Sequence, residues 1–333
     1  MMELKEAYTI LYNLVGANKE DHFIFTSSGA ESVNHAVLAT YLDVTRKTGK
    51  NHFISGVVDE APAIMAMSRL TDLNCTYVTA PVDRFGQISA QAVMETLTPR
   101  TAMVSLSWAN RLTGVIQPVA EIGELCRDRG IVFHVDATHV LGKGEYTLEA
   151  SKADLLTFDG FIDGTGGLFM RAGVEMSPLI LGGNEQAQMR AGRINLAGLH
   201  MLAKAAQEAM RFCDHFGLEV ARLRNQFEEI IGPGLFFEKT RLPHISAHIF
   251  SGVTSDALLY LLNRRGIDHA TFGGNHLQHL MHILRECGVE GQDIHSGLSF
   301  SFSHDITQKD IEKTAKETLE VVKHLRSLSH ELR

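Results

Sequence analysis

The chain has 333 residues, of which 44% are hydrophobic and 21% are charged, so its composition is that of a folded globular protein long enough for about two domains. Its formal net charge is −8, and its lysine and arginine residues are scattered among acidic ones, which argues against nucleic acid or an anionic membrane as partner. No apolar run approaches the ~20 residues that a membrane span needs. The start of the chain is typical of a charged helix and not of a signal peptide, and the four widely spaced cysteines indicate buried thiols in a reducing cytoplasm.

Over the first two thirds of the chain, short apolar runs alternate with amphipathic stretches. Runs that are hydrophobic almost throughout predict strands buried on both faces, as in a mostly parallel sheet. The alternation of strands with helices indicates an α/β fold. The predicted strands are residues 23–25, 53–55, 76–78, 103–106 and 131–135, and the predicted helices between them include 61–73 and 119–129. The stretch 154–167 is predicted to be a buried strand that runs into a glycine-rich loop.

From about His200 the pattern changes. A long helix is predicted over residues 201–216, with Gly217 at its end. We therefore predict a large domain over residues 1–215 and a smaller α+β domain over residues 216–333. The elements predicted for the smaller domain are a strand at 242–250, a helix at 256–265, a strand at 297–302 and a terminal helix at 307–332.

Four segments, in this order, resemble the cysteine desulfurases, which fall within the class-V aminotransferase group of fold-type I pyridoxal-phosphate enzymes. They run from Phe25 to Asn34, from Trp108 to Pro118, from Cys126 to His139, and from Gly182 to Gly192. The resemblance implies a large domain with a mostly parallel central sheet, a smaller C-terminal α+β domain, and a homodimer. The family has a further segment before the first helix, so we expect either a truncated start or a protein that works without it.

The resemblance assigns remnants of a cofactor site to five residues. Family members hold the pyridine nitrogen with an aspartate, which corresponds to Asp136, and they place an asparagine near the ring hydroxyl, which corresponds to Asn110. His139 stands where the family usually has a glutamine, and Ser28 and Gly29 lie in the turn that faces the phosphate. Alternatively, Asp136 caps the turn after its strand, and Asn110 and His139 satisfy loop backbone groups.

Other family positions carry residues that cannot do the expected chemistry. The Schiff-base lysine aligns near Ile162, and the sequence has no lysine between Lys152 and Lys204. A Schiff base needs a primary amine, which no neighbouring side chain supplies. The remaining replaced positions are Glu60 for the histidine that stacks on the ring, Ser299 for the substrate-binding arginine, and the loop near Gly273 for the persulfide cysteine.

The phosphate cup is also altered. Its threonine corresponds to Ala30, its serine to Asp159 and its histidine to Phe161. A phosphate dianion needs N–H and O–H donors and positive charge, and Asp159 would repel it at close range. The resemblance thus implies phosphate binding that is weakened but not lost, because Ser27, Ser28 and the amides of Gly29 and Ala30 at a helix start could still hold an anion.

Three further features have structural alternatives. Lys143 could replace the missing lysine, but the family often has a lysine near this place for unrelated reasons. His276, His279 and His282 form an HxxHxxH pattern on a predicted helix, which favours a solvated or interface face over a metal site. Cys287 is expected as a packed thiol within the following helix.

These replacements predict a cysteine-desulfurase-like protein without desulfurase activity, without a cofactor and without a metal, which acts as a binding or regulatory homologue. Its expected partners are a second copy of the chain, an active desulfurase, or proteins of iron–sulfur cluster assembly. The alternative is an enzyme with an altered reaction that holds pyridoxal 5'-phosphate or its amine form noncovalently through Asp136, Asn110 and the Ser27–Gly29 turn. His139 would then be the base. A decayed gene product is a third interpretation, which the intact core pattern disfavours.

Overall fold

The computed structural model describes residues 3–236, 238–274 and 276–331. The chain divides into two compact units. Unit 1 comprises Met1–Pro81, Ile88–Trp108 and Gln117–Arg211, and unit 2 comprises Val82–Gln87, Ala109–Ile116 and Phe212–Arg333. The predicted boundary at residue 215 stays a prediction. None of the helices in the described ranges is both long and apolar enough to cross a membrane.

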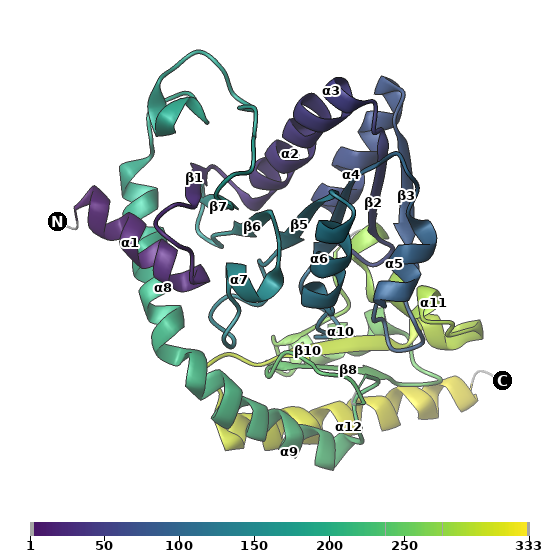
Figure 1. The fold of residues 1–333 in the computed structure, drawn as a ribbon. Helices are drawn as coiled ribbons and strands as arrows, with labels where there is room; N and C mark the ends of the chain where they lie inside the picture. The colour runs from purple at the N-terminus through teal and green to yellow at the C-terminus, as the bar shows by residue number, and fades with distance from the viewer. Residues whose placement is uncertain (1–2, 237, 275, 332–333) are drawn as a thin grey trace. The chain divides into compact units, whose positions relative to one another are not determined.

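Unit 1 is built on a seven-stranded sheet with the strand order β1-β7-β6-β5-β4-β2-β3 (Figure 1). The strands from β6 to β3 along this order pair in parallel, whereas β7 is antiparallel to both β1 and β6. The predicted α/β fold with a mostly parallel central sheet is confirmed. The strands are β1 (His22–Thr26), β2 (His52–Gly56), β3 (Thr76–Ala80), β4 (Thr101–Ser107), β5 (Val132–Asp136), β6 (Leu155–Asp159) and β7 (Gly166–Met170).

Helices cover this sheet because its strands are apolar on both faces. Helix α2 packs on β6 and β7, α4 packs on β2, and α6 packs on β5. The buried core beneath α2 and α4 includes Phe53, Met67 and Leu168. The helical segments are α1 (Leu4–Val15), α2 (Gly29–Thr40), η1 (Tyr41–Thr45), α3 (Arg46–Thr48), α4 (Ala61–Arg69), η2 (Leu70–Leu73), α5 (Ala90–Thr96), α6 (Val119–Asp128), α7 (Leu148–Ser151), η3 (Glu185–Gln188) and α8 (Leu196–His215), whose last residues belong to unit 2.

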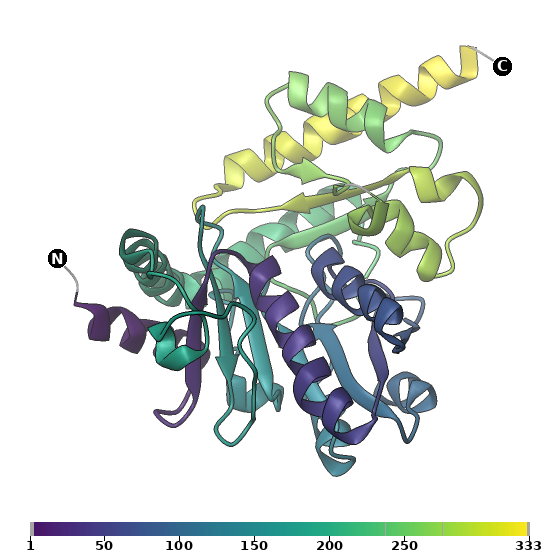
Figure 2. The same cartoon turned by 90° about the horizontal axis from the view of Figure 1, so that it is seen from above.

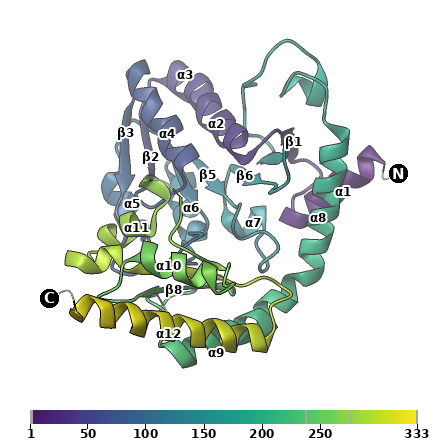
Figure 3. The same ribbon diagram turned by 180° about the vertical axis from the view of Figure 1, so that it is seen from behind.

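Unit 2 contains an antiparallel three-stranded sheet in the order β8-β10-β9 and its own core around Phe227, Phe300 and Phe302. Helix α12 lies beside α9 (Figure 3) and beside α10 (Figure 2). The predicted second, smaller region of α+β structure is therefore confirmed, because unit 2 has its own sheet and helices. Its elements are η4 (Phe216–Val220), α9 (Ala221–Ile231), β8 (Ile245–Ile249), α10 (Ser255–Arg264), β9 (Ala270–Thr271), η5 (His276–Gln278), α11 (Leu280–Glu286), η6 (Gly291–His295), β10 (Gly297–Ser301) and α12 (Gln308–Glu331).

Two local predictions are wrong. Gly217 does not end the long helix, because α8 passes through the π-helical turn η4 into α9 without a left-handed residue. The helix instead ends before Gly232, which has φ of +105°.

The HxxHxxH pattern does not lie on one helix either. A 3₁₀ turn ends at Gln278, and the ring of His279 accepts a hydrogen bond from Met281 N (3.1 Å) at the start of α11. No group of metal-ligating side chains occurs within the described ranges.

Candidate functional site

The carboxyl ends of β4, β5 and β6 lie at one edge of the unit 1 sheet, and Asp136 ends the central strand of the three. Its Oδ1 accepts hydrogen bonds from Thr138 Oγ1 (2.5 Å) and Thr138 N (2.9 Å). No described residue bonds its Oδ2. Burial raises the pKa of Asp136, and the bonds from Thr138 only partly oppose this effect. A protonated ring nitrogen placed beside Oδ2 would therefore stabilise the ionised carboxylate.

Glu60 and His139, which the resemblance assigned to separate roles, are partners in the structure. Glu60 Oε1 lies 3.3 Å from His139 Nε2, with the side chains 15% and 18% exposed, respectively. Glu60 stands at the N-cap of α4 but makes no side-chain cap bond, so helix capping does not account for the position of its carboxylate. The expected stacking position thus holds an acid whose charge a protonated His139 would balance.

A second buried acid beside this pair was missed from the sequence. The Asp59 carboxylate accepts hydrogen bonds from Gly56 N (2.7 Å) and Ser107 N (2.9 Å) and so joins the ends of β2 and β4. Burial raises the pKa of Asp59 to about 7, and the charge of Asp136 adds to this rise. The only sequence signal was an acid between a buried strand and the next helix, where an acid can also simply open the helix.

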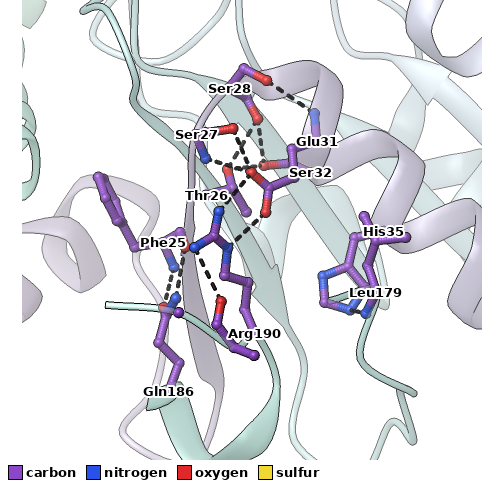
Figure 4. A network of polar contacts seen from close by, with 12 residues as sticks. Phe25, Thr26, Ser27, Ser28, Glu31, Ser32, His35, Leu179, Gln186 and Arg190 are labelled. Atoms are coloured by element: carbon purple, nitrogen blue, oxygen red, sulfur yellow. Dashed lines mark hydrogen bonds and ion pairs between the residues drawn. The ribbon is translucent and has the colours of Figure 1, made fainter. Parts of the chain in front are cut away.

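The start of α2 lies at the same sheet edge as the end of β6. Ser28 is the N-cap, and its Oγ accepts a hydrogen bond from Glu31 N (3.1 Å). Gly29 N donates to Asp159 Oδ2 at 2.9 Å. Figure 4 shows Glu31 turned back toward Ser27 and paired with Arg190, whose Nε lies 2.9 Å from Glu31 Oε1. The predicted residues Ser28 and Gly29 therefore lie beside the carboxylates of Glu31 and Asp159, and both carboxylates already bond to groups of the chain itself.

The loop between β6 and β7, where the lysine position aligns, is short and closed. Thr165 N and Thr165 Oγ1 both donate to Ile162 O, at 3.0 and 2.6 Å. Phe161 has a left-handed backbone, with φ of +51°, and the residue is 73% exposed. Of the lysines that flank this loop in sequence, Lys152 pairs with Glu149 (3.0 Å) and Lys204 is exposed on α8. Neither projects from the turn that Ile162 occupies.

The other predicted positions belong to unit 2. The Asn110 Oδ1 accepts from Leu112 N (2.9 Å) and Thr113 N (3.0 Å), which supports the alternative of a loop residue satisfying its own turn. Ser299 is buried in β10, and its hydroxyl has no partner within the described ranges. Gly273 is left-handed, with φ of +98°. Cys287 follows α11 rather than lying within it, and burial raises its pKa to about 12.

None of the four cysteines forms a disulfide. Three of them are buried, as expected, but Cys213 is only half-buried. Cys126 lies in the core of unit 1, where burial raises its pKa to about 12.

The fold and the order of the motifs agree with comparisons to known proteins. The profile of the family described as aminotransferase class-V matches residues 2–314. The chain belongs to this family. It is 31% identical to the cysteine desulfurase NifS of Azotobacter vinelandii over 98% of this chain and 84% of that protein. A cysteine desulfurase of Gluconacetobacter diazotrophicus is also 31% identical, over 96% of this chain and 82% of its own length.

Solved structures show the same fold. A structure described as a NifS-like protein matches with a TM-score of 0.86 and 22% identity over 96% of this chain and 87% of the solved one. The apo cysteine desulfurase from Thermococcus onnurineus NA1 matches with a TM-score of 0.82 and 19% identity, over 96% and 84% of the two chains. The predicted relation to the cysteine desulfurases and to fold-type I is therefore confirmed.

Membership in this class-V aminotransferase family overturns the prediction that the chain has no cofactor. The homologues are pyridoxal-phosphate-dependent cysteine desulfurases, so pyridoxal phosphate is the cofactor to expect. The prediction was wrong because it inferred absence from individual replaced side chains, whereas the fold that surrounds the site is retained throughout.

The residues at the site fit one end of this cofactor better than the other. At the pyridine end, Asp136 Oδ2 is available to a ring nitrogen. At the phosphate end, the amide of Gly29 is already bonded to Asp159, and at the aldehyde end the loop around Ile162 carries no amine. The phosphate and aldehyde ends do not fit, and the structure therefore supports no reaction step through the cofactor.

Proposed function

We propose that this class-V aminotransferase homologue has no cysteine desulfurase activity and acts as a binding or regulatory protein. The observation that carries the proposal is the closed β6–β7 turn, in which Ile162 stands at the lysine position and no primary amine is present. Without an amine there, an aldehyde cofactor has no covalent anchor and its reaction has no lysine to move a proton at the substrate carbon.

Two further observations support this proposal. The Cys287 thiol is buried with a pKa of about 12, so it is not a thiolate at neutral pH and cannot accept sulfur as a nucleophile. Ser299 offers a single buried hydroxyl where the family has a guanidinium, so it lacks the two-pronged donor that grips a carboxylate.

The proposal predicts that the purified protein releases no sulfide from cysteine. The measurement is sulfide production with added pyridoxal 5'-phosphate, compared with the same free cofactor without protein. A homologous active cysteine desulfurase, assayed in parallel, controls for the assay conditions. Sulfide release that exceeds the cofactor control and is lost on heat denaturation would contradict the proposal.

A second candidate is an enzyme with an altered reaction that holds a pyridoxal-type cofactor noncovalently. The observation that favours it is Asp136, whose Oδ2 has no partner among the described residues. His139 and Glu60 would lie near the ring as an acid–base pair. Lys143 is the relocated amine to consider, because burial lowers its pKa to about 8 and so favours its neutral, nucleophilic form.

Absorption spectra before and after incubation with pyridoxal 5'-phosphate and desalting distinguish these candidates. A cofactor band that borohydride does not fix to a lysine supports noncovalent binding through Asp136. Fixation on Lys143, located by peptide mass mapping, would show a relocated anchor and contradict the assignment of the site as lysine-free. Lys143→Gln is the matched variant, since it removes the amine and retains most of the side-chain length.

We also propose that the chain forms a homodimer and works in the cytoplasm with an active desulfurase or with iron–sulfur assembly proteins. The support is the relation to the cysteine desulfurases. Light scattering coupled to size-exclusion chromatography measures the oligomeric state. Co-purification with a purified desulfurase or scaffold protein tests the partner.

A further inference from the structure

The start of α2 already holds internal anions. Three successive features show this: Gly29 N donates to Asp159 Oδ2 (2.9 Å), Ser27 N donates to Glu31 Oε2 (2.8 Å), and Ser27 Oγ donates to the same oxygen (2.6 Å). Free amides at a helix N-terminus bind anions because the N–H groups and the helix dipole both favour negative charge. Here carboxylates of the chain itself occupy that role.

Asp159 is fixed in this position from several sides. Its own N–H donates to Thr138 Oγ1 (3.0 Å), and its Oδ1 accepts from Phe161 N (2.8 Å). The contact with α2 is also close, because a Cβ added to Gly29 would lie 2.8 Å from the Cβ of Asp159. No room remains between this carboxylate and the helix start for a second anion. Thr138 also connects Asp159 to Asp136, since its Oγ1 accepts from Asp159 N and donates to the Asp136 carboxylate.

The charge balance opposes a phosphate at this point. Glu31 and Asp159 are two acids, and the nearby cation, Arg190, is bonded to Glu31 through Nε (2.9 Å) and Nη2 (3.3 Å). These bonds hold the pKa of Glu31 below its usual value although burial alone would raise it. A phosphate dianion arriving at Gly29 would meet the Asp159 carboxylate, which pairs with no described cation, within hydrogen-bond range of the same amide, and like charges at such distances repel.

We propose that Asp159 is an internal substitute for phosphate that makes this site discriminate against phosphorylated ligands. A pyridoxal-type ring held by Asp136 would therefore bind without its phosphate at least as well as with it. This inference rests on the proposed noncovalent site, and it names the chemical class that the site accepts: a protonated pyridine ring without a strongly anionic group on the side of α2.

The test compares pyridoxal 5'-phosphate with unphosphorylated pyridoxal on wild-type protein and two variants. Asp159→Ser frees the Gly29 amide and adds a hydroxyl donor, and Asp159→Asn removes only the charge. We expect Asp159→Ser to bind pyridoxal 5'-phosphate at least about tenfold more tightly than wild type, the effect expected of one additional charge-assisted hydrogen bond. Affinity for pyridoxal should not change, and Asp159→Asn should show a smaller increase in affinity for the phosphorylated ligand.

Equilibrium dialysis measures these affinities without relying on any activity. Asp163→Ser is the matched control, because Asp163 is an exposed acid in the same loop. Inorganic phosphate should compete with pyridoxal 5'-phosphate in Asp159→Ser and not in wild type. The inference is overturned if the phosphorylated ligand binds no more tightly to either variant, if affinity for pyridoxal rises equally, or if Asp163→Ser has the same effect. Sulfide release from cysteine by wild type would refute the proposed function separately and leave this comparison intact.

Discussion

A buried histidine in the middle of the unit 1 sheet connects three strands. His134 on β5 contacts Ser105 Oγ of β4 through Nδ1 (2.7 Å) and Thr157 Oγ1 of β6 through Nε2 (2.8 Å). Burial lowers the pKa of His134 to about 3, far below the ~6.5 of an exposed histidine. Because the unfolded chain binds this proton more readily than the folded one, protonation destabilises the fold as pH falls below about 6.5.

The variant His134→Gln should therefore lose less stability in acid than wild type. Between about pH 6 and pH 4, the difference in unfolding free energy between the two proteins should narrow by up to ~1.4 kcal/mol per pH unit, the value for one proton. Urea unfolding at several pH values measures this slope. The exposed His22→Gln is the control and should follow wild type. Parallel pH profiles for wild type and His134→Gln would show that His134 does not carry the acid sensitivity.

At the same scale, the sequence located residues better than it located their partners. Asp136, Ser28 and Gly29 could be placed at a strand end and a helix start because apolar runs and motif order define those positions. The bond between Gly29 and Asp159 could not be predicted, because it joins residues far apart in the chain whose approach depends on how α2 crosses β6. Asp159 was expected only to repel phosphate, whereas in the structure it also accepts a hydrogen bond from the Gly29 amide.

At the scale of elements, a glutamine side chain completes the outer edge of the sheet. Strand β1 lies at one end of the strand order, and its Phe25 N and O bond to Gln186 Oε1 (2.7 Å) and Nε2 (2.8 Å), as Figure 4 shows. Gln186, Ala187 and Gln188 all have positive φ, a conformation that costs free energy for residues other than glycine. The two side-chain bonds supply a reason why this strained turn persists.

Removing the two bonds from the Gln186 side chain to the Phe25 backbone should make the edge strand β1 open more readily. In Gln186→Ala, the amide of Phe25 loses its acceptor, so its hydrogen exchange should become faster and the turn should become more sensitive to proteolysis. Gln188→Ala is the matched control, because Gln188 is exposed in the same turn with φ of +66°. Native-state hydrogen exchange followed by mass spectrometry measures the effect. Equal exchange rates at Phe25 in wild type and Gln186→Ala would show that the Gln186 bonds do not protect the edge strand.

Element boundaries show the limit of sequence patterns in a different way. The strands of the sheet were recognisable because burial on both faces leaves continuous apolar runs. The end of the long helix was misplaced because glycine was taken as a stop, while Gly217 keeps a right-handed backbone inside a π-helical turn. The histidine pattern near the start of α11 was misassigned for a related reason: a 3₁₀ turn and a capping residue interrupt the helical spacing.

At the scale of the whole molecule, the path of the chain joins the two units repeatedly. It passes between them at 81/82, 87/88, 108/109, 116/117 and 211/212. Two short segments of unit 2, Val82–Gln87 and Ala109–Ile116, interact there with residues that come later in the chain. Asp83 pairs with Lys239 (2.9 Å), and Gly114 O accepts a hydrogen bond from Leu242 N (2.8 Å). Unfolding of unit 2 therefore releases segments whose ends are also the ends of unit 1 strands.

This connectivity predicts that the units unfold together. Phe227 is fully buried in the unit 2 core, and Phe227→Ala should lower its stability by ~3–5 kcal/mol through lost packing and a cavity. Trp108, the single tryptophan, ends the β4 segment of unit 1, so its fluorescence reports on the other unit. We expect the urea midpoint of the Trp108 fluorescence to fall together with that of the far-ultraviolet circular dichroism, since the segment of unit 2 that begins at residue 109 cannot unfold without releasing the end of β4.

The control is Leu218→Ala. Leu218 is 75% exposed, so this variant should leave both midpoints unchanged. A tryptophan midpoint that stays at the wild-type value in Phe227→Ala while the circular dichroism transition splits would show that the units unfold independently, and the repeated crossings would then constrain the path of the chain without coupling its stability.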